Sequence, residues 1–215
     1  MDIPNYQYFE KLNLTYKSPG HLMHKKMKLV SSYVNPGKSL IDVGCGTGEF
    51  IVQFKDRFNS LVGIDTSSHA IEFTARRLGN NKQVRLECGA LGSFHFPAEH
   101  FDVCVCLDVL EHVETPLLLL QEIHRILRPE GEIIVTVPNW YDIIVSGIFR
   151  VDPFHINTLT PWAWMRLLRR AGFKIKLCRA VDFPILKSDL LARKVYFLGM
   201  CILIVAIRPP GQDSV

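Results

Sequence analysis

Three glycines at alternate positions constrain this chain more than any other feature. They lie in Asp42-Val43-Gly44-Cys45-Gly46-Thr47-Gly48, directly after an apolar run and before a segment with helical periodicity. Glycine adopts left-handed dihedrals and has no Cβ, so a ligand can lie against the main chain of such a strand-to-helix turn. The spacing differs from the G-x-G-x-x-G of dinucleotide-binding turns, and Asp42 is unsuited to a pyrophosphate. We therefore expect a cationic or zwitterionic ligand, with a ligand-free tight turn as the structural alternative.

The rest of the chain alternates β-branched apolar runs with helical periodicity, which predicts a parallel sheet covered by helices on both faces. Helices are expected after the capping segment Thr66-Ser67-Ser68 and after Thr115 and Thr160, each of which precedes a proline. With 215 residues, 48% of them apolar, the chain suits a single domain over 1–215. Strands are expected at 39–43, 61–65, 84–88, 101–107, 132–137, 173–178 and 200–207.

Further motifs follow the glycine turn in order. Asp65 ends the second expected strand, Ala90 and Leu91 follow the third, and the segments 101–113 and 127–132 contain the fourth strand with its exit loop and the turn before the fifth. Together these residues resemble the class I S-adenosylmethionine-dependent methyltransferases over roughly residues 38–178. The resemblance implies a Rossmann-like, seven-stranded, mostly parallel sheet whose last strand is antiparallel, and S-adenosylmethionine as cofactor, with S-adenosylhomocysteine as product.

The resemblance also implies which residues bind the cofactor. Asp65 would bind the ribose hydroxyls, although capping of the following helix is an alternative role for it. Ala90 stands where the family usually has an acid that reads the adenine, so backbone groups are expected to read it here. Because ligands bind beyond the carboxyl ends of parallel strands, Gly44, Asp65, Ala90 and Asp108 are expected around one crevice. The full expected set is Asp42, Gly44, Cys45, Gly46, Gly48, Asp65, Thr66, Ala90, Leu91, Asp108 and Val109.

Methyl transfer from a sulfonium requires alignment of donor and acceptor and exclusion of water rather than covalent machinery. A hydroxyl or carbon acceptor also needs a base, for which we favour His155 and His112 as catalytic residues; Glu111 and Tyr141 are further candidates. Structural histidines satisfied by backbone groups are the alternative. The remaining histidines show no ligand spacing, so no metal site is expected.

Three segments outside the repeating pattern are expected to cover the substrate: an N-terminal helical cap at 1–32 and lid insertions at 139–159 and 180–193. Their aromatic and aliphatic side chains indicate a small apolar or aromatic methyl acceptor. The exit loop resembles the quinone-biosynthesis branch of small-molecule enzymes, which leaves oxygen, nitrogen and carbon acceptors open. Two other functions are weighed: a catalytically silent cofactor-binding partner subunit and an NAD-dependent oxidoreductase, which the glycine spacing disfavours.

Charge and cysteine content limit the partners and the compartment. The net charge is +4 without a basic run, so nucleic acid is not an expected partner. Six cysteines without a C-x-x-C pair indicate reduced core thiols and a cytoplasmic protein. The apolar run at 195–207 is too short to cross a bilayer and predicts a buried strand. Peripheral membrane contact and the choice between monomer and homodimer stay open.

Overall fold

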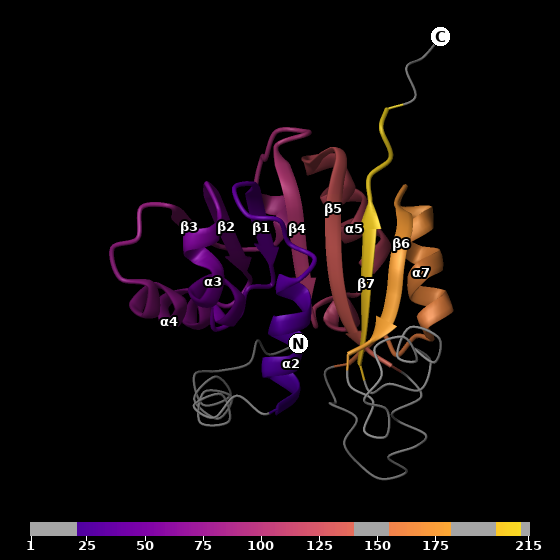
Figure 1. Cartoon of the computed structure of the whole chain (residues 1–215), viewed down its shortest axis with the longest axis horizontal. Helices are drawn as coiled ribbons and strands as arrows, with labels where there is room; N and C mark the ends of the chain where they lie inside the picture. Colours follow the sequence, from indigo (N-terminus) through magenta and orange to yellow (C-terminus); the bar gives the residue numbers. More distant parts are fainter. Residues whose placement is uncertain (1–20, 140–154, 182–200, 212–215) are drawn as a thin grey trace. The chain divides into compact units, whose positions relative to one another are not determined.

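The computed structural model describes residues 21–139, 155–181 and 201–211. The chain forms two compact units, one up to His95 and one from Phe96 onward. Both combine β-strands with α-helices, and the described ranges contain seven strands (Figure 1).

The first unit contains three parallel strands in the order β3-β2-β1, so β2 is central and β3 lies at an edge. Ile41 of β1 and Val62 of β2 are register partners and are both buried, as expected for strands covered on both faces. Helix α4 packs against β2 and β3. The elements are α2 His21–Ser31, β1 Ser39–Val43, α3 Glu49–Phe54, η1 Lys55–Arg57, β2 Ser60–Asp65, α4 Ser68–Leu78, β3 Val84–Cys88 and η2 Leu91–Ser93.

The second unit contains four strands in the order β4-β5-β7-β6. Strands β4 and β5 are parallel, whereas β7 runs antiparallel to both of its neighbours. Six consecutive residues of β7 are buried, in keeping with its central place between β5 and β6, and α7 packs against β6 (Figure 1). The elements are β4 Phe101–Leu107, η3 Leu110–His112, α5 Pro116–Ile126, β5 Leu127–Pro138, α7 Pro161–Arg170, β6 Lys174–Ala180 and β7 Cys201–Ile207.

These strands and directions confirm the predicted fold class, a Rossmann-like, mostly parallel sheet with an antiparallel last strand. The predicted helix starts agree with the structure in all three cases. The hydroxyls of Ser67 and Thr160 accept hydrogen bonds from the amides of Ala70 and Ala163, three residues further along the chain. Thr115 is the N-cap of α5, which begins at Pro116 as predicted, but its hydroxyl makes no such bond, and its carbonyl accepts the amides of Leu118 and Leu119.

The predicted turn at 127–132 is instead part of β5. The register with β4 jumps between the pairs Phe101–Leu127 and Val103–Glu132, and Glu130 has a positive φ of 63°. Extra residues of β5 thus bulge out at the place where a turn was predicted.

Several other expectations meet the structure only in part. The N-terminal cap is helical in α2, whereas residues 1–20 lie outside the described residues, as do 140–154 and 182–193 of the lid insertions. Cys88 is exposed rather than a core thiol because its strand lies at an edge. None of the six cysteines, all within the described residues, forms a disulfide. The strand predicted from the apolar run is present over Cys201–Ile207, and all of its residues except Ile207 are buried. Within the described ranges, no helix has the length and apolar character needed to span a bilayer.

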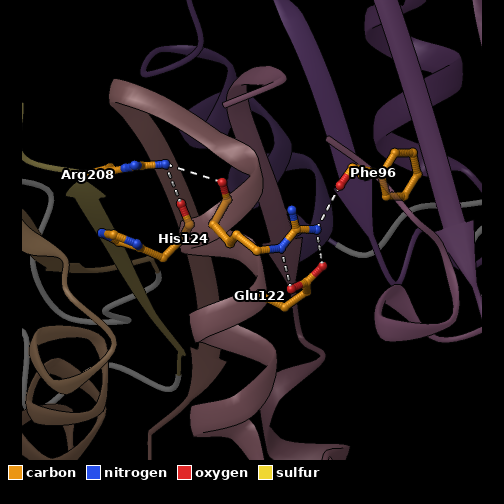
Figure 2. A network of polar contacts seen from close by, with 5 residues as sticks. Phe96, Glu122, His124 and Arg208 are labelled. Atoms are coloured by element: carbon orange, nitrogen blue, oxygen red, sulfur yellow. Dashed lines mark hydrogen bonds and ion pairs between the residues drawn. The ribbon is translucent and has the colours of Figure 1, made fainter. Parts of the chain in front are cut away.

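An arginine at the end of β7 holds the carboxyl end of helix α5 in the second unit. The Nη1 atom of Arg208 donates to the carbonyls of His124 and Leu127 at 3.2 and 2.6 Å, and its Nη2 atom lies 2.8 Å from Glu99. Figure 2 shows the Arg208 guanidinium pointing at the helix end. Arg125 donates hydrogen bonds to the Glu122 carboxylate and to the carbonyl of Phe96. Cations at this end satisfy orphan carbonyls and interact favourably with the helix dipole.

Replacing Arg208 with alanine is expected to lower the free energy of unfolding by about 2 kcal/mol, because charged hydrogen bonds to helix-end carbonyls are lost. Arg128→Ala is a matched control, since Arg128 forms an ion pair with Asp102 in which both side chains are partly exposed, and we expect a loss below about 1 kcal/mol. Urea unfolding of both variants measures the difference. Equal losses would contradict a special role of Arg208 at the helix end.

Candidate cofactor site

The glycine loop joins β1 to α3 through left-handed residues. Gly44, Gly46 and Gly48 have φ values of 73°, 51° and 75°. The amides of Gly44 and Cys45 donate to the carbonyl of Ile64 at 2.8 and 2.9 Å, which ties the loop to the end of β2. The conformation predicted from glycine spacing is therefore present.

The carboxylate of Asp65 is held between the glycine loop and the start of α4. Its Oδ2 accepts the amide of Gly46 and its Oδ1 the amide of Ser67, both at 2.8 Å. Burial raises the pKa of Asp65, while the two amides partly offset the rise. Each carboxylate oxygen has a second lone pair, so it can accept a further hydrogen bond from a ligand. Asp65 thus organises the loop and the helix start and still has acceptor capacity for a ligand.

Asp42 and Cys45 lie deeper in the same unit. Burial, and secondarily the negative charge of Asp65, raises the pKa of Asp42 to about 8. Burial together with both carboxyl groups also raises the pKa of the Cys45 thiol well above its usual value. Cys45 is therefore a protonated, buried thiol rather than a nucleophile. A buried acid of this kind favours a positively charged neighbour.

Helix α4 supports the outer side of the loop. The hydroxyl of Thr74 donates to the carbonyl of Gly46 at 3.0 Å, and Arg77 donates to the carbonyl of Thr47 at 2.7 Å and to Glu49 at 2.6 Å. Thr74 is fully buried. Sequence reasoning missed these supports, because neither residue belongs to a motif.

The predicted adenine segment follows β3 in the same unit. The amide of Gly89 donates to the carbonyl of Asp65 at 2.8 Å, so the segment begins beside the ribose-binding candidate. Leu91 is buried, whereas Ala90 is exposed, as is Thr66 after β2. The Ser93 hydroxyl donates to the carbonyl of Ala90 at 2.6 Å. The structure thus buries Leu91 and leaves Ala90 open to solvent.

In the second unit, Asp108 leaves β4 in a strained conformation, with φ of 54°. Its amide donates to the carbonyl of Thr136, and the Thr136 hydroxyl donates to its Oδ1, both at 2.9 Å. Thr136 is fully buried in β5. Val109 then precedes the short helix η3. Left-handed non-glycine residues persist where surrounding contacts hold them, often at functional sites.

The two histidines favoured as bases lie side by side in this unit. Their ring centroids are 4.8 Å apart, with the rings at 62° to one another. The carbonyl of Glu111 accepts the amides of Ile156 and Asn157 at 2.9 and 3.0 Å, which fastens the His155 segment to the turn that carries His112. Tyr141, another candidate base, lies outside the described residues. Backbone bonds thus assemble a histidine pair from segments far apart in sequence.

Comparisons with known proteins agree with this geometry. Residues 41–135 match the family described as Methyltransferase domain. A Mycolicibacterium smegmatis protein described as a probable S-adenosylmethionine-dependent methyltransferase is 26% identical over 65% of this chain and 53% of its own length. A ubiquinone biosynthesis O-methyltransferase of Actinobacillus pleuropneumoniae is 27% identical over 61% of this chain and 62% of its own length.

A solved S-adenosylmethionine-dependent methyltransferase from Thermotoga maritima superposes with a TM-score of 0.73 and 19% identity, covering 94% of this chain and 96% of that one, which shows the shared fold. The family match over residues 41–135, the curated relatives and the shared fold together support the class I S-adenosylmethionine-dependent methyltransferase superfamily. The cofactor of that superfamily is S-adenosylmethionine. The chain spans 53% and 62% of the two curated relatives' lengths.

Proposed function

We propose that this chain transfers a methyl group from S-adenosylmethionine to a small apolar or aromatic acceptor by in-line displacement. The observation that carries the proposal is the Asp65 carboxylate, which is fixed by the amides of Gly46 and Ser67 beside a left-handed glycine loop. A prearranged carboxylate next to a loop of left-handed glycines suits a ligand with vicinal hydroxyls.

The electrostatics of the same unit support a cationic cofactor. The buried Asp42 carboxyl lies near the loop and has a raised pKa, so a positive charge nearby would favour its ionised form. S-adenosylmethionine carries a sulfonium and an ammonium group, whereas a dinucleotide would bring a pyrophosphate. The first unit therefore suits the former ligand, and its proposed contacts are Asp42, Gly44, Cys45, Gly46, Gly48, Asp65, Thr66, Ala90 and Leu91.

For the acceptor, we propose that His155 and His112 take up the proton that a hydroxyl acceptor loses. Their rings are adjacent and at least partly accessible, which a proton acceptor requires. This proposal is supported by the relative described as a ubiquinone biosynthesis O-methyltransferase.

Calorimetric titration with S-adenosylmethionine, S-adenosylhomocysteine and NAD tests the cofactor. We expect micromolar binding of the two adenosyl ligands and none of NAD, with affinity at least tenfold lower in Asp65→Asn, because the amide cannot replace a charged acceptor. Asp56→Asn, an exposed carboxylate in η1, is the control and should bind like the wild type. Failure of both adenosyl ligands to bind would overturn the proposal.

Turnover tests the acceptor. Formation of S-adenosylhomocysteine is followed with hydrophobic phenols and quinols. His155→Ala should lose turnover by about a hundredfold, the range of a single general base, while cofactor affinity stays unchanged. Full turnover in the His155→Ala variant would rule out His155 as the general base.

A further inference from the structure

Three potential metal ligands meet in the second unit. Glu111, His112 and His155 each present one ligand atom, and these atoms all lie within 4.8 Å of one another. Glu111 and His112 are neighbours in helix η3, whereas His155 comes from the segment before α7. No metal site was predicted from the sequence, because the remaining histidines show no ligand spacing. The juxtaposition is created by folding.

The distances are close to those of a coordination sphere. Bonds from a divalent ion to imidazole nitrogen or carboxylate oxygen are about 2.0–2.2 Å, so two ligand atoms on one ion lie about 3.3–3.6 Å apart in a tetrahedral site and at most about 4.4 Å apart when they are opposite one another. Side-chain rotations that move each atom by less than about 1 Å would therefore suffice. We propose that Glu111, His112 and His155 form a binding site for one divalent transition-metal ion.

The supporting backbone is already in place. The carbonyl of Glu111 accepts the amides of Ile156 and Asn157, and the Asn157 side chain donates to the carbonyl of Val113. The two ligand-bearing segments are thus connected by three hydrogen bonds that do not use the ligand side chains. A preformed arrangement lowers the cost of ordering the ligands when an ion binds.

The donor set selects the kind of ion. Two imidazoles with one carboxylate suit zinc and other first-row transition metals, whereas magnesium and calcium prefer oxygen ligands throughout. Glu111 is buried, with 1% of its surface exposed, while His112 is exposed and His155 is half-buried. An ion would therefore lie between a buried carboxylate and solvent, with positions left for further ligands.

An open position gives the ion a function that rests on the proposed methyl transfer. A hydroxyl of the acceptor could occupy it, and a divalent ion lowers the pKa of an oxygen that it binds. With the two histidines serving as ligands, the hydroxyl would lose its proton to solvent at the exposed side of the site. Its oxygen would then form a bond to the methyl carbon while the C–S bond of S-adenosylmethionine breaks, leaving S-adenosylhomocysteine. This role would replace the role of free base proposed above for His112 and His155. The class of acceptor would then be one with a hydroxyl able to reach the metal.

Zinc binding to the full chain tests the site without any cofactor. After removal of adventitious metal with a chelator, we expect one zinc ion per chain by competition with a chromogenic chelator, and a visible cobalt spectrum typical of four or five ligands. His112→Ala and His155→Ala should each weaken binding at least tenfold, since loss even of a residue that only supports a ligand costs about 10–100-fold. His69→Ala, an exposed histidine of α4, is the matched control and should bind like the wild type.

His112 is exposed, so His112→Ala should fold normally. This variant therefore tests the site even if a substitution of the buried Glu111 prevents folding. Zinc affinity that is equal in wild type, His112→Ala and His155→Ala would overturn the site, as would a dissociation constant for the wild type weaker than about 100 μM, which is only about 5 kcal/mol of binding. Cofactor titration of the metal-free chain is a separate measurement, so failure of the metal site and failure of the proposed methyl transfer are distinguishable.

Discussion

Replacing Gly48 with alanine is expected to lower the free energy of unfolding by about 3 kcal/mol. Gly48 caps helix α3 in the left-handed conformation, with φ of 75° and ψ of 26°. A side chain in that conformation costs about 1–2 kcal/mol. A Cβ at this position would also lie 2.4 Å from Cγ2 and 2.8 Å from Oγ1 of Thr74. Thr74 is fully buried, so it has no free space to move into.

The steric part of this effect has an internal control. Gly46 also has a positive φ, of 51°, but a Cβ there would meet nothing within 4 Å. Gly46→Ala should therefore show only the conformational cost, about 1–2 kcal/mol. Overpacking against Thr74 adds about 1–3 kcal/mol in Gly48→Ala alone.

Urea unfolding of the cofactor-free protein measures both losses, and a double variant identifies their cause. Thr74→Ala removes the two atoms that the new Cβ would approach most closely. In a protein that already carries Thr74→Ala, Gly48→Ala should therefore lower the free energy of unfolding by at least about 1 kcal/mol less than it does in the wild type. Equal losses for Gly46→Ala and Gly48→Ala, or strict additivity with Thr74→Ala, would show that the contact with Thr74 does not limit this position.

The fold was more predictable from the sequence than the hydrogen bonds that hold the site residues in place. Strands at 39–43, 84–88 and 101–107 have the predicted bounds, because each is an apolar or alternating run delimited by polar and glycine residues. The β5 bulge was not predicted. Its residues, Arg-Pro-Glu-Gly, have the composition of a turn, and only strand pairing reveals that the chain continues in the sheet.

For the site, motif residues were predictable and their partners were not. The left-handed glycines follow from spacing alone, whereas the bond from the Gly46 amide to Asp65 depends on how two strand ends are placed. The His112–His155 pair depends on amides of Ile156 and Asn157, and backbone donors carry no sequence signal. Thr136 offered a weak signal, as a polar residue within the apolar run of β5, because a buried hydroxyl requires a hydrogen-bond partner.

Replacing Asp42 with asparagine is expected to stabilise the cofactor-free protein at neutral pH by a few kcal/mol. Burial and the charge of Asp65 raise the pKa of Asp42 from 3.8 to about 8, so the folded protein keeps this carboxyl protonated while the unfolded chain ionises it. The folded state then binds more protons than the unfolded state between these two pH values. Stability therefore falls as pH rises, by about 1.4 kcal/mol per pH unit, and is level again above pH 8.

An amide has nearly the same shape as the protonated acid and does not ionise. The gain from Asp42→Asn should thus be close to zero at pH 4, grow with pH, and reach its full size near pH 8. Some decline with pH should persist in the variant, because the pKa of Asp65 is also raised, mainly by burial. The charge on Asp65 remains, but its repulsion from Asp42 is gone.

Unfolding free energies from pH 4 to 8 for wild type, Asp42→Asn and the exposed-site control Asp56→Asn separate these contributions. The control should run parallel to the wild type within about 0.5 kcal/mol, since an exposed substitution rarely does more. If Asp42→Asn also runs parallel to the wild type, Asp42 is ionised in the folded, cofactor-free protein and is already neutralised by a contact with a positive or donating group. If the two curves diverge with pH, the protein keeps an acid neutral until a cation arrives. That behaviour fits a pocket for a sulfonium ligand, because the ligand's positive charge would then replace the proton.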